Sequence, residues 1–338
     1  MSAKVLIVVL AETRAHELTF PLFKENFLDR LGADLALCIG DNARETRNPF
    51  YDTAKYIWQY KEPDDWTVAF DEYAEGRDWR VLLELRDQWL GGIKHPTLQH
   101  PGSAGILVFF REFLRRKFEE TGALDAYDWL IITRSDFMWP MRHPGLELFS
   151  PEHIYVPDGE RYNGFTDRHI MVPKRFFKPF LDVARDVFAD PVALAGRMKA
   201  LGRPNWNLES FIKFRFGELG LLRSVRFFPY LMYSLRPSTG TTRWTGGTYS
   251  HEHRYFIKYP TEYNNSRILQ SLVVEDAHWR HLMGSPRFRN WRMYFYAWMR
   301  AHTELPFMPK RYQFLRLLRR FWILMMQPLE TGKLDSLR

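Results

Sequence analysis

Cysteine is nearly absent from the 338-residue sequence, and the apolar run at its N-terminus is short. Its one cysteine, Cys38, excludes an intramolecular disulfide framework and a cysteine-based zinc site. The N-terminal run, residues 5–11, is too short for the core of a signal peptide with its cleavage site and much too short to span a bilayer. A cytoplasmic location is therefore the default expectation.

Several common functional motifs are also missing. The sequence contains no GxGxxG loop and no GxxxxGK[ST] loop, which argues against a dinucleotide-binding enzyme of the usual kind and against a P-loop kinase. No Ser-His-Asp or Cys-His arrangement can be recognised, and neither an internal repeat nor a low-complexity segment is evident.

Hydrophobic and aromatic residues are plentiful instead. Hydrophobic residues make up 46% of the chain, enough to fill the core of one large α/β domain or of two lobes. The aromatic content of 16% is high for an ordinary enzyme; carbohydrate sites and membrane interfaces use such rings, although most of them must belong to the core.

The pattern of apolar runs predicts an α/β fold with a mostly parallel central sheet flanked by helices. Residues 4–10, 34–39, 127–133 and 154–156 are expected to be strands, 22–31 and 103–119 helices, and 225–233 a late strand. Residues 44–100 are interpreted as a helical insertion with loops, and 234–247, rich in Ser, Thr, Gly and Arg, as a mobile lid.

A polar pair follows the most apolar of these strands. Arg134 and Asp136 come directly after residues 127–133, where the carboxyl end of a parallel strand presents side chains to a ligand. Together they suit an anionic, metal-linked ligand such as a sugar nucleotide; the alternative is a surface ion pair.

The order of these elements, ending in an aromatic-Asp-Trp-apolar strand and Arg-x-Asp, resembles nucleotide-sugar glycosyltransferases of the GT-A fold. The nearest type is the bacterial and viral polysaccharide enzymes in which Arg-x-Asp replaces Asp-x-Asp. The resemblance covers residues 4–235 and implies a Rossmann-like catalytic domain over residues 1–284. It also implies a glycosyltransferase of hexosyltransferase type, which moves a sugar from a nucleotide-diphosphate-sugar donor to a glycan acceptor, lipid-linked or not, in cell-surface polysaccharide or lipopolysaccharide synthesis.

The resemblance assigns a divalent metal, Mn²⁺ or Mg²⁺, to Asp136. Because Arg134 replaces the first acidic residue of the motif, it could neutralise the diphosphate directly, so both solutions stay open. His251 and His253 could close a metal site from a later loop, or be ordinary loop histidines.

Two loop residues match the start of the family's nucleotide pocket. Arg14 is a candidate for a phosphate contact, with a solvated loop arginine as the alternative. Asp41 is a candidate for a base or ribose contact, although an Asp in Gly-Asp-Asn also simply forms a turn.

Residues 155–169 resemble the family's stretch over the donor sugar or the acceptor. Gly164 allows close approach of the backbone to a ligand, while Asn163, Asp167 and Arg168 can hydrogen-bond hydroxyl groups. A loop turn with a surface Asp–Arg pair is the alternative.

Glu209 matches the carboxylate that serves as general base in the resembling enzymes, and Asp167 is counted with it as catalytic. The alternative for Glu209 is a carboxylate favoured by the helix dipole, in a helix capped by Asn207.

The excess positive charge lies in the C-terminal tail, residues 285–338. This segment has eleven Lys and Arg against three Asp and Glu, and the remaining residues carry 37 of each sign. Over 310–326, Arg316, Arg319 and Arg320 lie opposite an apolar face with interfacial Trp, as in a helix on an anionic membrane surface. Packing on the enzyme or dimerisation is the competing interpretation, and nucleic acid is disfavoured because the rings lie away from Arg316.

Two other functions remain open on the sequence alone. A nucleotidyl- or phosphotransferase could use the same strand-end carboxylate. A non-catalytic glycan-binding scaffold could retain the fold without the chemistry.

Overall fold

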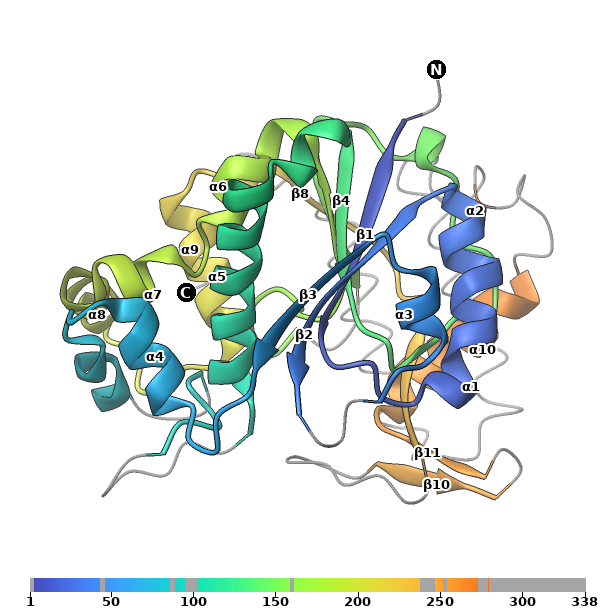
Figure 1. Cartoon of the computed structure of the whole chain (residues 1–338). Helices are drawn as coiled ribbons and strands as arrows, with labels where there is room; N and C mark the ends of the chain where they lie inside the picture. The colour runs from blue at the N-terminus through green and yellow to red at the C-terminus, as the bar shows by residue number, and fades with distance from the viewer. Residues whose placement is uncertain are drawn as a thin grey trace.

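The computed structural model of the chain is shown in Figure 1. It describes residues 3–42, 46–85, 89–94, 102–158, 161–237, 247–251, 254–272 and 279. The predicted tail over 285–338 and its membrane helix lie outside these residues, as does His253.

A seven-stranded sheet runs through the middle of the molecule in the order β3-β2-β1-β4-β7-β6-β8. Its strands are β1 (Val5–Ala11), β2 (Asp34–Asp41), β3 (Tyr56–Lys61), β4 (Trp129–Thr133), β6 (Ile154–Asp158), β7 (Ile170–Pro173) and β8 (Val225–Pro229). The pairs β3–β2, β2–β1, β1–β4 and β6–β8 are parallel, and β7 is antiparallel to both β4 and β6. The fold is therefore a mixed α/β fold with a largely parallel sheet.

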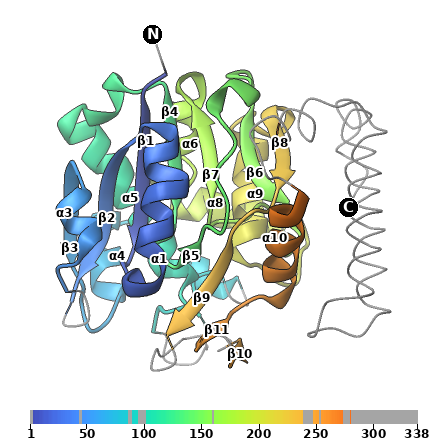
Figure 2. The same ribbon diagram turned by 90° about the vertical axis from the view of Figure 1, so that its right-hand side faces the viewer.

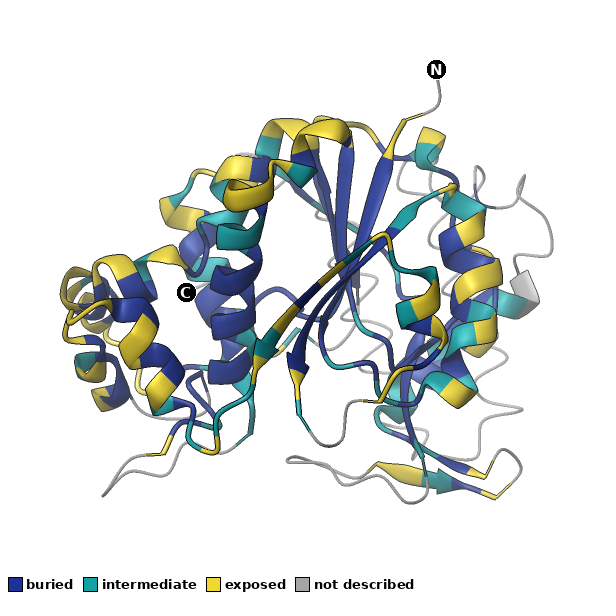
Figure 3. Ribbon diagram, in the orientation of Figure 1, coloured by how far each residue is buried: buried dark blue, intermediate teal, exposed yellow. Residues whose placement is uncertain are grey.

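Strand β1 is buried on both faces because every residue in it is aliphatic. Leu6, Val8 and Leu10 belong to one hydrophobic core, and the residues between them, such as Ile7, belong to another. Two layers of helices cover these faces (Figures 1 and 3), which explains why the sequence of β1 shows no alternation of polar and apolar residues.

Helices on one side of the sheet are α4 (Thr67–Ala74), α5 (Ala104–Thr121), α6 (Phe177–Leu181), α7 (Arg185–Ala189), α8 (Pro191–Ala200) and α9 (Leu208–Glu218). On the other side lie α1 (His16–Phe23), α2 (Asp29–Leu31), α3 (Pro49–Thr53) and α10 (Pro260–Leu272). A π-helical stretch, Lys24–Leu28, joins α1 to α2. Short 3-10 turns cover Trp79–Glu84, Ala123–Ala126, Leu146–Leu148, Lys174–Phe176 and Leu222–Ser224.

A second sheet has the order β10-β11-β9-β5. Its strands are β5 (Phe137–Met138), β9 (Tyr233–Pro237), β10 (Thr248–Ser250) and β11 (Tyr255–Ile257), all antiparallel to their neighbours. Figures 1 and 2 show β10 and β11 beyond the carboxyl end of β1, so this sheet borders the edge where ligands bind in such folds.

The strands expected at 4–10, 34–39, 127–133 and 154–156 are confirmed, and so is the long helix α5, which Gly122 ends in the left-handed conformation with φ 63°. The segment expected as a helical insertion with loops over 44–100 does contain α3, α4 and a 3-10 turn, but it also contributes β3 to the central sheet, which was not expected. β3 is an edge strand in which exposed Ile57, Gln59 and Lys61 alternate with half-buried or buried aromatic residues, so its sequence lacks the continuous apolar run of a central strand.

Two further expectations change. The expected strand over 225–233 divides into β8 and β9, which belong to different sheets. Residues 234–237 of the expected lid lie within β9, and the following nine residues fall outside the described part of the chain. Within the described ranges, no helix is both long and apolar enough to cross a membrane.

Candidate functional site

Two loops meet at the carboxyl ends of β1 and β4. The hydroxyl group of Ser135, after β4, contacts the backbone oxygens of Glu12 and Arg14, after β1, at 2.9 and 3.1 Å. Ala11, the last residue of β1, and Ala15, in the following loop, have φ of 79° and 62°, a left-handed conformation that costs free energy for alanine. The surrounding contacts therefore hold this loop in a defined shape, which fixes where Arg14 can reach.

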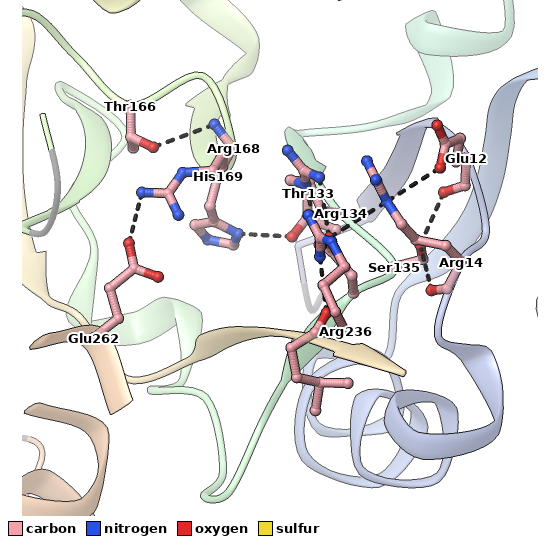
Figure 4. A network of polar contacts seen from close by, with 12 residues as sticks. Glu12, Arg14, Thr133, Arg134, Ser135, Thr166, Arg168, His169, Arg236 and Glu262 are labelled. Atoms are coloured by element: carbon pink, nitrogen blue, oxygen red, sulfur yellow. Dashed lines mark hydrogen bonds and ion pairs between the residues drawn. The ribbon is translucent and has the colours of Figure 1, made fainter. Parts of the chain in front are cut away.

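Three arginines converge on Asp136, and we call Arg14, Arg134 and Arg236 the arginine cluster. Arg134 donates to both carboxylate oxygens, with Nε–Oδ1 and Nη2–Oδ2 distances of 3.0 Å. Arg14 Nε lies 3.5 Å from Oδ2, and Arg236 Nη1 donates to the same oxygen. Figure 4 shows the three arginines side by side, so residues from three distant parts of the chain form one site.

The second sheet delivers Arg236 to this site. Strand β9 pairs with β5 and with β11, and the backbone N–H of Leu235 donates to the carbonyl oxygen of Asp136 at 3.0 Å. Arg236 therefore approaches Asp136 from a strand that is hydrogen-bonded to the same residue.

Burial and charge act in opposite directions on Asp136, whose side chain is 1% exposed. Burial alone would raise its pKa, but Arg134, Arg236 and Arg14 outweigh burial and hold the pKa of the carboxyl well below its usual range. Burial lowers the pKa of Arg236 to about 10, and its arginine neighbours add to this effect. Glu12 Oε2 also lies 3.1 Å from Arg14 Nε, so the site holds three guanidinium groups against two carboxylates, an excess of positive charge that attracts anions.

A fourth cationic side chain, Lys258, faces the same cluster. It follows β11, and its backbone N–H donates to the carbonyl oxygen of Ser234 at 3.0 Å. Burial, followed by the charges of Arg134 and Arg236, lowers the pKa of the Lys258 amine to about 6. Lys258 is therefore largely neutral at neutral pH because it is buried, and because it lies close to other cations.

Glu209 lies in the first turn of α9, which Asn207 caps as expected by accepting a hydrogen bond from Ser210 N at 2.8 Å. Burial, and then the nearby carboxylate of Asp167, raise the pKa of Glu209 to about 8. The structure thus brings the two predicted catalytic carboxyl groups close enough to interact, and at neutral pH Glu209 retains a proton.

The loop over residues 161–169 packs against the start of α9. Phe165 N donates to the carbonyl oxygen of Glu209 at 3.1 Å, and the Asn207 side chain donates to the carbonyl oxygen of Tyr162 at 3.0 Å. A Cβ at Gly164 would lie 1.8 Å from the Glu209 carbonyl oxygen. Gly164 thus allows a close approach of two backbones within the protein, while Asn163 is exposed at the loop surface.

Arg168 is buried at 3% exposure, and its Nη2 donates to Glu262 Oε1 of α10 at 2.6 Å. Its guanidinium also lies 4.5 Å from the ring centroid of Tyr259 (Figure 4 shows the pair with Glu262). This ion pair connects the loop to α10 and explains why Arg168 is buried. The predicted contact of Arg168 with a hydroxyl group of the donor is not needed for that.

Neither Asp41 nor His251 is among the side chains that pair with Asp136. Asp41 is exposed at the end of β2, next to β1, and its backbone oxygen accepts from Glu62 N at 3.1 Å. His251 is exposed after β10, with its ring 5.0 Å from that of Tyr249.

The residues around Asp136 do not fit a divalent cation. Both carboxylate oxygens already accept from guanidinium groups, and a cation would lie beside three positive charges.

The sequence did not reveal Arg236 and Lys258. In the sequence, each is simply a basic residue in or after a short apolar segment. Such a residue indicates a site only once the pairing of β9 with β5 and β11 is known.

Comparison of the chain with protein-family models gives no match, and a search of curated proteins finds none with significant similarity.

Proposed function

We propose that the protein is a glycosyltransferase of the GT-A type, which transfers a sugar from a nucleotide-diphosphate-sugar donor to a glycan acceptor. The observation that carries the proposal is the arginine cluster at the carboxyl edge of β1 and β4. A diphosphate is the part of such a donor that guanidinium groups recognise best, since they match its oxygens with paired N–H donors.

The carboxyl pair of Asp167 and Glu209 supplies the second element that this reaction needs. The acceptor hydroxyl oxygen forms a bond to the anomeric carbon of the donor sugar as the bond from that carbon to the phosphate oxygen breaks. The electron pair of the broken bond leaves with the nucleoside diphosphate, whose new charge the arginine cluster stabilises. The proton of the hydroxyl group passes to Glu209, which must first have lost its own proton.

The acceptor is proposed to be a glycan, free or lipid-linked, in the synthesis of cell-surface polysaccharide or lipopolysaccharide. Attachment to an anionic membrane surface through residues 310–326 stays a prediction, because the segment lies outside the described residues.

The test is to incubate the protein with UDP-, GDP- and dTDP-sugars and glycan acceptors and to identify the nucleotide or phosphate that is released. Release of the nucleotide that carried the sugar, dependent on acceptor, supports the proposal. Release of pyrophosphate instead identifies a nucleotidyltransferase, and glycan binding without any release of nucleotide identifies a scaffold.

A further inference from the structure

We propose that the arginine cluster holds the donor diphosphate without a divalent cation, and that Asp136 is a positioning residue for its three guanidinium groups. The inference rests on the proposed function and specifies how that site recognises its leaving group.

The first support is the number of contacts that Asp136 already makes. Arg134 takes both oxygens in a paired arrangement at 3.0 Å, and Oδ2 also accepts from Arg236 and lies 3.5 Å from Arg14. A metal ligand needs a free lone pair directed at the ion and is usually joined by other oxygen ligands. Asp136 instead uses its oxygens to hold cations that belong to the protein.

The second support is the difference in exposure between the carboxylate and the guanidinium groups. Asp136 and Arg236 are 1% and 2% exposed, Arg134 is 14% exposed and Arg14 is 32% exposed. A ligand that arrives from solvent therefore meets guanidinium groups before it meets the carboxylate. Each guanidinium carries five N–H donors, more than the contacts to Asp136 use.

The third support is electrostatic. Three guanidinium groups from the β1–α1 loop, the β4–β5 segment and β9 would repel one another without a central anion. Asp136 offsets one of these charges, Glu12 beside Arg14 offsets a second, and Asp136 fixes the orientation of the donors before any ligand binds. Because the remaining charge is positive, the site keeps an attraction for a diphosphate, and donors held in place lose little entropy on binding.

The test measures the binding of UDP-glucose, GDP-mannose and dTDP-glucose by calorimetry, in excess EDTA and in millimolar MgCl₂ or MnCl₂. We expect the compound that binds to have the same dissociation constant in both conditions. Asp136→Asn should weaken binding equally with and without metal, because it disturbs the arginines. The matched control is Asp71→Asn on α4, which breaks the ion pair of Asp71 with Arg80 and should not change binding.

A second variant decides the question if Asp136→Asn fails to fold. Arg14 is partly exposed, so Arg14→Gln should fold, and it should weaken binding in EDTA by roughly tenfold or more, as loss of a charged hydrogen bond does. Arg47→Gln, which removes an exposed arginine paired with Asp52, should leave binding unchanged.

The outcomes separate the two levels of the proposal. Binding that requires Mg²⁺ or Mn²⁺, with Asp136→Asn removing only the metal-dependent part, would overturn this inference and leave the proposed function standing. Unchanged binding by Arg14→Gln would overturn the inference as well. If none of the three nucleotide sugars binds in any condition, the proposed function itself fails.

Discussion

Gly164 approaches Glu209 so closely that a Cβ at position 164 would stand 1.8 Å from the Glu209 carbonyl oxygen and 2.0 Å from its carbonyl carbon. The loop over residues 161–169 and the first turn of α9 are thus in direct backbone contact. This contact joins Asp167 and Glu209 into one rigid part of the site.

Gly164→Ala should therefore displace the loop from α9. Because the obstructing atoms belong to the backbone, they have little room to yield, and overpacking of this kind costs about 1–3 kcal/mol. Chemical denaturation should show this loss, together with reduced turnover. Gly196→Ala on α8 is the control: no atom lies within 4 Å of the new Cβ, so it should leave stability unchanged or raise it by up to about 1 kcal/mol.

The pH dependence of turnover should report Glu209. Because its pKa is raised to about 8, the general base is protonated at neutral pH, and turnover should increase with pH up to about 8 and then level off. Glu209→Gln should lower turnover by roughly 10²–10⁴ and remove this dependence, while donor affinity stays near that of the wild type. A folded Glu209→Gln protein with wild-type turnover would leave Glu209 as a residue of the helix end only.

The same pKa shift has a consequence for stability. A carboxyl group whose pKa rises on folding favours the folded state at low pH and disfavours it as pH rises through the folded value. Glu209→Gln should therefore raise the melting temperature above pH 8 relative to the wild type.

Lys258 should take up a proton when a diphosphate binds. In the free protein its pKa of about 6 leaves the amine neutral at neutral pH, because burial and the facing cations Arg134, Arg236 and Arg168 outweigh Asp136. A bound diphosphate favours the ammonium form, so the affinity for a nucleotide sugar should rise as pH falls towards 6. Calorimetry in two buffers of different ionisation enthalpy measures this proton uptake.

Glu209 also interacts electrostatically with Lys258, so the control variant should retain a basic side chain at position 258. Lys258→Arg meets this requirement and stays charged at every pH tested. It should bind the nucleotide sugar without proton uptake. Equal proton uptake by the wild type and by Lys258→Arg would show that another group titrates.

His143 should make the protein sensitive to mild acid. It is buried, Nδ1 donates to the carbonyl oxygen of Pro144 at 2.7 Å, and burial lowers its pKa from 6.5 to about 4. Between these values the unfolded chain binds more protons, so the free energy of unfolding should fall by up to roughly 3 kcal/mol as pH falls from 6.5 to 4. Urea unfolding should show that the free energy of unfolding depends less steeply on pH in His143→Gln than in the control His251→Gln, which alters an exposed histidine.

The sequence predicted the part of the site that directly follows the two apolar strands β1 and β4. Arg134 and Asp136 follow an apolar run that only a buried strand explains, and Arg14 follows another, so both loops were expected at one edge of the sheet. The hydroxyl group of Ser135 joins these two loops, and no sequence pattern predicts that contact.

The second half of the site was hidden because its strands are short and paired across long separations. Arg236 lies in β9, which pairs with a two-residue strand about one hundred positions earlier in the chain. Gly164 was predicted to let the backbone approach a ligand closely, whereas the structure shows a close approach to the backbone of α9, which only tertiary packing determines.

The central claim is that the arginine cluster binds a diphosphate, and affinity measurements on Arg134→Ala test it most directly. The measurement compares the dissociation constants of a nucleotide sugar and of its parent nucleoside for the wild type and for the variant. We predict that Arg134→Ala lowers the affinity for the nucleotide sugar by roughly tenfold or more and leaves the affinity for the nucleoside unchanged, because only the nucleotide sugar carries phosphate. Equal affinity of both proteins for the nucleotide sugar would contradict the account.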